Sequence, residues 1–367
     1  DDIFVSNDFF EKDYIYLNNQ NGTFKESSAE VFSELSTGSM GADIADLNND
    51  GLPEIFVTEM LPESLERYKA KTVFDSYDKI RLNQSKGYHR QYGRNVMQYN
   101  TGIKDGLPQY IDLGRYHGVE ATDWSWGALM ADFDNDGLKD IFVANGIYKD
   151  LLDQDHINFY SPQQISKMLK EKKENVILSM MDALPSEPLQ NYLFTQNQEN
   201  KFISSHPPNS KGFSNGSAYA DFDNDGDLDL IINNINDKAS LYKNTTIDNN
   251  FIKIKLEGHK NNPRAIGAKV VAYKNDKIYM LENNPMRGYQ SCVSNDLIFG
   301  LGDYDFVDSI KVTWPNQKIS LYKNLRSDST YSFNISKSRS IIHKSNSTKK
   351  STLLSKVEGI IEYEHAE

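Results

Sequence analysis

Three nine-residue acidic segments repeat along the chain with the same spacing of carboxylates, and this repeat restricts the fold more than any other feature. They are residues 46–54, 132–140 and 221–229, which align without gaps on the formula Asp-x-(Asp/Asn)-x-Asp-Gly-x-x-(Asp/Glu). Small residues precede each segment, and a β-branched or aromatic run follows it. This order predicts a strand, an acidic loop and a second strand. Its repetition indicates a repeat architecture.

The intervals between the loops indicate the size of the repeated unit. Both intervals contain a segment rich in helix formers, residues 61–95 and 148–190, and Ser161 followed by Pro162 has the pattern of a helix start. Without these inserts, about 45–50 residues remain per unit, close to the four-stranded blade of a β-propeller. We therefore predict propeller blades over residues 1–250, with two helical inserts. A β-sandwich with acidic turns is the alternative fold that the pattern leaves open.

The sequence pattern at both ends of the chain predicts that the polypeptide continues beyond residues 1–367. Residues 1–250 hold about three and a half blade units, whereas propellers close with about 4–8. Asp2 aligns with the last position of an acidic loop. At the other end, residues 336–351 are rich in Ser, Lys and Asn and predict a linker, and residues 352–367 predict the start of a second repeat region. We interpret the chain as a segment of a longer protein.

Between the blades and this linker, residues 251–335 alternate polar and apolar positions in short runs separated by Gly and Asn-Pro breaks. Five strands are expected, over residues 252–256, 268–273, 277–281, 307–312 and 319–322. The predicted fold class is therefore all-β, with a partial propeller followed by a small β-sandwich-like domain.

The acidic loops have the chemistry of a calcium site. Oxygen ligands at positions 1, 3 and 5 of a tight loop point inward, position 7 offers a main-chain oxygen, and a carboxylate at position 9 closes the far side. Glycine at position 6 permits the sharp turn. Ligation by oxygen alone selects a hard cation, and the high ligand number favours Ca²⁺ over Mg²⁺. The predicted ligands of three Ca²⁺ sites are Asp46, Asn48, Asp50, Leu52 and Glu54, then Asp132, Asp134, Asp136, Leu138 and Asp140, then Asp221, Asp223, Asp225, Asp227 and Asp229.

A solvated Asp/Asn/Gly turn is the alternative interpretation of a single loop of this kind. Three copies with one spacing favour metal, because four or five carboxylates within one turn repel strongly unless a cation neutralises them. The first loop is the weakest candidate, since Asn48 takes the place of a carboxylate there. The expected role is structural, because a short loop closed on its ion leaves little room for a substrate.

Charge and composition exclude several classes of function. The formal net charge of −12 opposes nucleic-acid binding and an anionic membrane surface. The single cysteine, Cys292, excludes an internal disulfide and a cysteine zinc site. No apolar run approaches the ~20 residues of a membrane span.

The loops and their flanks resemble the FG-GAP/VCBS repeats of integrin-type β-propellers. Residues 251–335 resemble the ASPIC/UnbV domain through segments such as 287–291 (Arg-Gly-Tyr-Gln-Ser) and 299–302 (Phe-Gly-Leu-Gly). Together with insert motifs such as 121–127, they resemble the cartilage acidic protein family, in particular its large bacterial envelope members. The resemblance implies a seven-bladed propeller whose first half precedes Asp1, and an exported protein of the bacterial envelope or the extracellular space.

The sequence contains no recognisable catalytic motif. The seven histidines include no i, i+4 pair, and neither a Gly-x-Ser-x-Gly elbow nor a phosphate-binding glycine loop is present. Trp124 and Trp126 are expected in the blade core, as are the Phe residues that follow Asp132 and Asp221. We therefore expect a non-catalytic, calcium-stabilised surface or secreted module that binds protein or glycan at the insert rim. An outer-membrane protein complex is a candidate partner.

Two alternatives remain open. The first is a calcium-dependent polysaccharide lyase or hydrolase, for which His89, Arg90, Tyr92 and Arg94 over a central channel are the candidate cluster. The second is a purely structural spacer.

Overall fold

The structure of this chain is a computed structural model. It describes residues 2–8, 11–71, 77–160, 166–167, 182, 184–246 and 248–339. Strands dominate these residues and the helices are short, so the predicted all-β class is confirmed. The expected helix start at Ser161 and the expected second repeat region at 352–367 lie outside the described residues.

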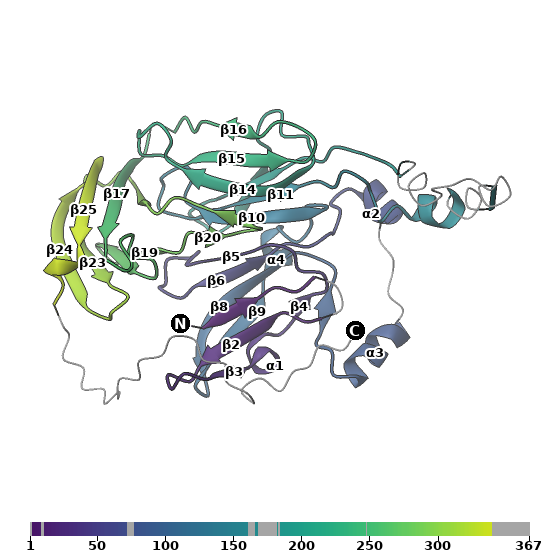
Figure 1. Cartoon of the computed structure of the whole chain (residues 1–367), viewed down its shortest axis with the longest axis horizontal. Coiled ribbons are helices and arrows are strands. Elements are labelled where there is room, and N and C mark those ends of the chain that lie inside the picture. Colours follow the sequence, from purple (N-terminus) through teal and green to yellow (C-terminus); the bar gives the residue numbers. More distant parts are fainter. Residues whose placement is uncertain are drawn as a thin grey trace.

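Four antiparallel sheets follow one another in sequence order, stacked from bottom to top in Figure 1. The first contains β1 (Ile3–Val5), β2 (Tyr14–Asn18) and β3 (Phe24–Glu26). The second contains β5 (Ala42–Ala45), β6 (Glu54–Val57), β8 (Val96–Lys104) and β9 (Leu107–Asp112). The third contains β10 (Ser125–Ala131), β11 (Asp140–Asn145), β12 (Tyr192–Gln196) and β13 (Phe202–Ser205). The fourth contains β14 (Ser214–Ala220), β15 (Asp229–Asn234) and β16 (Ser240–Tyr242). These sheets are the blades that the repeats predict.

The run after each of the first two acidic loops packs two blades at once, because alternate side chains of a strand point to opposite faces of its sheet. Ile55 and Val57 pack toward the first blade, whereas Phe56 packs toward the third. Residues 141–143 repeat this arrangement one blade further along. At the two ends of the stack the outward-facing side chains are exposed, as for Ile3 (46 %) and Ile231 (37 %).

Short elements lie between the blades and within them. Those between blades are α1 (Ser28–Val31) and α4 (Gly114–His117), and those within blades are α2 (Leu65–Lys71), α3 (Tyr77–Ser85) and a π-helical turn over His156–Tyr160. A short parallel pair joins β4 (Leu35–Ser36) to β7 (Gln91–Tyr92). Thus α2 and α3 confirm the helical character of the first insert. Figure 1 shows both helices at the end of the molecule opposite the C-terminal β domain.

The C-terminal β domain consists of two facing sheets and a hairpin. One sheet contains β22 (Leu297–Gly302), β17 (Asn250–Glu257) and β25 (Ser329–Asn334). The other contains β19 (Lys277–Glu282), β18 (Lys269–Lys274), β23 (Phe306–Thr313) and β24 (Ile319–Arg326). The hairpin contains β20 (Met286–Arg287) and β21 (Ser291–Cys292). All five expected strands are present, and β20, β21, β22 and β25 are additional.

The core of this domain lies between its two sheets. Ile252, Phe299 and Phe333 come from one sheet and Ile310 from the other, and the fully buried Trp314 donates its indole N–H to Ser320 Oγ at 2.9 Å. The domain extends beyond its expected end at 335. A 3₁₀ turn covers Ile335–Lys337, and Arg339 exchanges two backbone hydrogen bonds with Ile319. Residues 336–339, which were expected to begin a linker, are therefore bonded to the domain.

Candidate metal-binding loops

The three acidic loops occupy equivalent places, each joining the first and second strands of its blade. Their backbones follow the same path. The residue at position 4 is left-handed in all three, with φ values of 59° at Asn49, 59° at Asn135 and 63° at Asn224. The glycine at position 6 also has positive φ, between 87° and 98°. Asparagine and glycine tolerate this region best, so the repeated Asn-Asp-Gly specifies the turn directly.

Carboxylates converge in the second and third loops. Oxygen atoms of Asp132, Asp134 and Asp136 all lie within 4.8 Å of one another. Asp221, Asp223 and Asp225 form the equivalent group in the third loop. These are the positions 1, 3 and 5 that the loop formula predicts as ligands.

Position 1 of both loops keeps a buried oxygen atom free. Among the described residues, Asp132 Oδ1 and Asp221 Oδ1 have no hydrogen-bond partner. Burial, with added repulsion from Asp136 and Asp134, raises the pKa of Asp132 to about 8. A buried oxygen without a partner is costly, so each loop has an unsatisfied acceptor where a cation fits.

The first loop differs in its interior. Asn48 Nδ2 donates to Asp50 Oδ2 at 2.9 Å. Both oxygens of Asp46 accept backbone N–H groups, from Asp50 at 3.1 Å and Gly51 at 3.0 Å. This loop therefore satisfies its own acceptors to a greater extent than the other two do.

Position 9 has a role that the loop formula did not indicate. Asp140 accepts the backbone N–H of Phe133 at 3.0 Å on one oxygen, and that of Gln196 in the third strand of the blade at 2.9 Å on the other. Glu54 and Asp229 make the same pair of contacts in their own loops. Asp2 accepts the N–H of Asn18 in the same way, at 2.8 Å. The acid at position 9 thus fastens the loop to its blade, and the converging group in the second loop does not include Asp140.

Position 7 contributes an N–H group to the loop interior. The amides of Leu52 and Leu138 donate to the carboxylates of Asp50 and Asp136 at 2.8 and 2.7 Å. Asp227 is buried, and this burial, followed by its neighbour Asp225, raises the pKa of Asp227 to about 7. The expected ligation by the main-chain oxygens of position 7 remains a prediction.

Neighbouring loops are bonded to one another. Asn49 Nδ2 donates to the carbonyl of Gly137 at 2.8 Å, and Asn135 Nδ2 donates to the carbonyl of Gly226 at 3.2 Å. Each link runs from position 4 of one loop to position 6 of the next. The loops therefore form a continuous row along one end of the blades.

The C-terminal β domain covers the second loop. Gly302 donates its backbone N–H to the carbonyl of Asn135 at 2.9 Å. Gly300 passes so close that a Cβ atom there would overlap Asp132 Oδ2 and the backbone of Asn135. Tyr279 lies against Gly137 in the same loop. Gly300 of the Phe-Gly-Leu-Gly segment is thus required by a close approach to an acidic loop, whereas Gly302 has a positive φ of 54° that favours glycine.

Two lysines reach the third loop. Lys253 of β17 is buried and donates to Asp221 Oδ2 at 2.8 Å and to Asn224 Oδ1 at 3.3 Å. The exposed Lys243 pairs with Asp223, and with Asp225 at 3.3 Å. Because Lys253 occupies Oδ2 of Asp221, the unpartnered Oδ1 is the atom left to face a cation.

The other candidate residues lie in packing or paired positions. Trp124 is buried against Met40 and Leu189, which confirms its expected place in the blade core. Phe133 is buried as expected, but Phe222 is 52 % exposed. That expectation was wrong for Phe222, because the described chain places no further sheet against the outer face of the fourth blade.

The candidate catalytic cluster does not lie against β5, β10 or β14, the first strands of the second, third and fourth blades. His89, Arg90 and Tyr92 line a cleft beside α3, and the described residues of that cleft include none from β5, β10 or β14. Arg94 is buried and paired with Glu34 at 2.6 Å and Asp112 at 2.7 Å.

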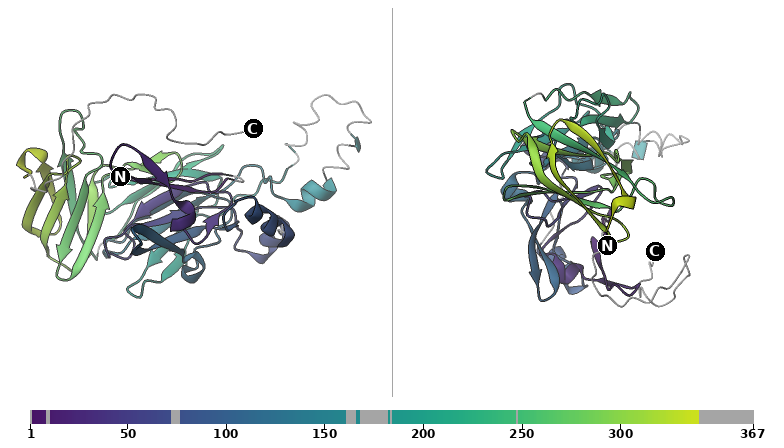
Figure 2. Two further views of the ribbon diagram at one scale, coloured as in Figure 1. Left: turned by 90° about the horizontal axis from the view of Figure 1, so that it is seen from below. Right: turned by 90° about the vertical axis from the view of Figure 1, so that its left-hand side faces the viewer.

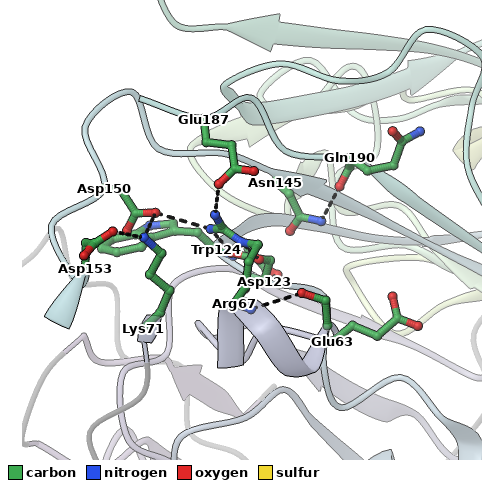
Figure 3. Close-up of polar contacts among 12 residues, drawn as sticks. Glu63, Arg67, Lys71, Asp123, Trp124, Asn145, Asp150, Asp153, Glu187 and Gln190 are labelled. Carbon is green, nitrogen blue, oxygen red and sulfur yellow. Dashed lines mark hydrogen bonds and ion pairs between the residues drawn. The ribbon is translucent and has the colours of Figure 1, made fainter. Parts of the chain in front are cut away.

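At the insert end, a group of ion pairs holds α2 against the second insert (Figure 3). Arg67 pairs with Asp123, and with Glu187 at 2.5 Å. Lys71 pairs with Asp150 at 3.0 Å and with Asp153 at 2.5 Å. Sequence reasoning missed these contacts, because no local pattern links residues more than fifty positions apart.

Comparison with known proteins agrees with these observations. Residues 1–57 match the FG-GAP-like repeat, and residues 258–340 match the family described as ASPIC and UnbV. The chain is 24 % identical to cartilage acidic protein 1 of Xenopus tropicalis over 329 residues, covering 87 % of this chain and 40 % of the frog protein. The mouse and human proteins of that name are each 23 % identical. The chain spans about two fifths of the length of these relatives.

The predicted resemblance is therefore confirmed for the two domain types, with weak similarity to cartilage acidic protein 1 over most of the chain. These similarities indicate an extracellular or surface β-rich module. Within the described residues, no helix combines the length and apolar character needed to cross a membrane.

Proposed function

We propose that this chain is a non-catalytic, calcium-stabilised scaffold of the cell surface or extracellular space, which presents its inserts to a protein or glycan partner. The observation that carries the proposal is the convergence of three carboxylates in each of the second and third loops, where one buried Asp oxygen has no hydrogen-bond partner among the described residues. Ca²⁺ takes 6–8 oxygen ligands in flexible geometry. In the second loop, whose carboxylates form no ion pair with the described residues, it would supply the missing positive charge, and in the third loop it would add to the charge of Lys243 and Lys253.

The donor set of each loop fits such an ion to a different degree. Asp132, Asp134 and Asp136 would hold it in the second loop, and Asp221, Asp223 and Asp225 in the third. The first loop offers Asp46 and Asp50 with the amide of Asn48, and its internal hydrogen bonds favour weaker binding. We therefore expect the second and third loops to fill before the first.

The position of the loops supports a structural role for the ion. The second loop lies between the blades and the C-terminal β domain, where Gly300 packs directly on Asp132. A substrate has no access across that contact. A cation in the second loop would instead relieve repulsion among its carboxylates and so stabilise two blades and the domain above them.

Thermal unfolding of the whole chain tests the metal part of the proposal. At a calcium concentration 100-fold above Kd, each filled site adds about 2.7 kcal/mol to the free energy of unfolding. We expect calcium to raise Tm by several degrees relative to EGTA, and Mg²⁺ to raise it less. Asp132→Asn and Asp221→Asn should each reduce the calcium-dependent shift, whereas Asp276→Asn, at an exposed turn, should leave it unchanged. Equal melting with calcium and EGTA would overturn the proposal.

A test of partner binding at the inserts requires a deletion variant that leaves the blade core intact. Leu189 is buried against Trp124, and Asp150 pairs with Lys71, so removing all of residues 148–190 would disturb the blades. Replacing residues 157–183 with a short Gly/Ser linker avoids both. We expect this variant to keep the calcium-dependent Tm and to lose co-purifying partners. Retention of the same partners would count against binding by the second insert.

A further inference from the structure

A cleft beside the first insert has a lining unlike the acidic surface expected of a chain with net charge −12. It lies between α3 and β7 and has a volume of about 170 Å³. The described residues that line it include no carboxylate. The residues that matter for its chemistry are Lys79, Asn83, Tyr88, His89, Arg90 and Tyr92. Figure 2 shows α3 at the insert end of the molecule, away from the C-terminal β domain, and residues of α3 line the cleft.

Two tyrosines give this cleft exposed aromatic surface. Tyr88 is 41 % exposed and Tyr92 is 36 % exposed. The Arg94 guanidinium lies 4.7 Å from the centroid of the Tyr92 ring and is itself anchored by Glu34 and Asp112. The Tyr92 ring is therefore supported before a ligand arrives. Rigid aromatic rings supply contact area at low entropic cost, and their polar O–H groups remain available for hydrogen bonds.

The polar groups of the cleft are suited to hydroxyl groups and negative charge. His89 Nε2 lies 3.1 Å from the carbonyl of Phe32, which assigns its proton to Nε2 and leaves Nδ1 as an acceptor. Burial lowers the pKa of His89, which favours this neutral form. Arg90 is exposed and forms no ion pair with the described residues. Its guanidinium N–H groups are therefore available to donate to a carboxylate or sulfate.

We infer that this cleft binds an anionic sugar, either a uronic acid or a sulfated residue of a glycan. Arg90 receives the negative charge, the Tyr88 and Tyr92 rings contact the apolar face of the sugar, and Asn83 and His89 bind its hydroxyl groups. The inference rests on the proposed scaffold function and gives the chemical class of its glycan partner. A neutral glycan would leave the Arg90 charge unused, and an acidic peptide would not need two exposed rings.

Affinity electrophoresis and calorimetry of the whole chain, with four polymers, test this inference. Polygalacturonate carries carboxylates, dextran sulfate carries sulfates, dextran is neutral, and poly-L-glutamate is an acidic peptide. We expect binding to at least one anionic polysaccharide, weakening as NaCl is raised, with no binding to dextran. The choice between polygalacturonate and dextran sulfate identifies the anionic group. Equal binding to dextran or to poly-L-glutamate would overturn the inference.

Variants locate the binding in the cleft. Arg90→Gln and Tyr88→Ala should each lower affinity at least tenfold, and Arg90→Lys should recover part of the loss. Arg115→Gln and Tyr116→Ala, at exposed positions of α4, are the matched controls and should bind normally. Normal binding by Arg90→Gln would show that the cleft is not the site. Absence of binding to all four polymers would also reject the inference, while the calcium-dependent Tm of the same samples still tests the scaffold independently.

Discussion

Arg287 Nη1 donates to Asp43 Oδ1 at 2.8 Å, joining the β20–β21 hairpin to the first strand of the second blade across 244 residues of sequence. Both side chains are buried, with exposures of 9 % and 2 %. Around this pair, Gly288 donates its N–H to Ala42, and Tyr289 packs on Trp126 at a centroid distance of 4.9 Å. The hairpin is thereby held against the inner strands of neighbouring blades.

Loss of one partner of this ion pair should be strongly destabilising. Arg287→Ala leaves Asp43 buried without its cation, and the expected cost is about 3–5 kcal/mol of unfolding free energy. Adding Asp43→Asn removes the uncompensated charge and should restore part of this loss. Urea unfolding measures both effects, with the exposed Arg264→Ala as control. An Arg287→Ala protein as stable as the parent would refute the structural importance of the pair.

Gly300→Ala should separate the C-terminal β domain from the second loop. The added Cβ meets the backbone of Asn135, which cannot move aside as a flexible side chain can. Overpacking of this kind costs about 1–3 kcal/mol or more. We expect faster proteolysis between the blades and the domain, and a smaller calcium-dependent Tm shift. Gly212→Ala is the control, because its Cβ would be 3.4 Å from the nearest atom, and its proteolysis pattern should match that of the parent.

Calcium binding should release protons near neutral pH. Without a cation, burial and then its acidic neighbours raise the pKa of Asp132 to about 8, so this group is largely protonated at pH 7. Calcium requires the ionised form and displaces the proton. Affinity should therefore increase as the pH rises toward 8. Calorimetry in PIPES and in Tris, which bind calcium weakly and differ in ionisation enthalpy, measures the release. Identical binding heats in the two buffers would contradict the expected protonation.

Glu59 should destabilise the folded protein at high pH. It is buried, its Oε2 has no hydrogen-bond partner in the described structure, and burial raises its pKa to about 8. The folded state therefore holds a proton that the unfolded state, with a pKa near about 4.3, has lost. Because the folded state binds more protons, stability is full below about pH 4 and falls as the pH rises toward 8.

Glu59→Gln imitates the protonated form. We expect this variant to be more stable than the parent at pH 8 and equally stable at pH 4.5, as measured by denaturant unfolding at both values. Glu66→Gln, at an exposed position of α2, is the control. A Glu59→Gln protein that loses stability at pH 8 would show that the ionised carboxylate makes a favourable contact.

Local sequence was sufficient to predict the blades and the backbone of their loops. The alternation in residues 55–57 specifies which side chains face each neighbouring blade, since strand side chains alternate strictly between faces. The Asn-Asp-Gly of each loop likewise specifies, through residue type alone, positive φ at its Asn and at its Gly. Both signals act within a few residues, so they can be recognised without knowing the fold.

Contacts between distant segments depended on the three-dimensional arrangement. Phe133 and Phe222 occupy the same position of the same motif, yet only Phe133 is buried, because only its blade has a following sheet against that face. The approach of Gly300 to Asp132 and the pairing of Arg287 with Asp43 join residues more than 150 positions apart. Side-chain chemistry fixes what such groups can bind, but their partners are set by how the blades and the domain pack, which no local pattern encodes.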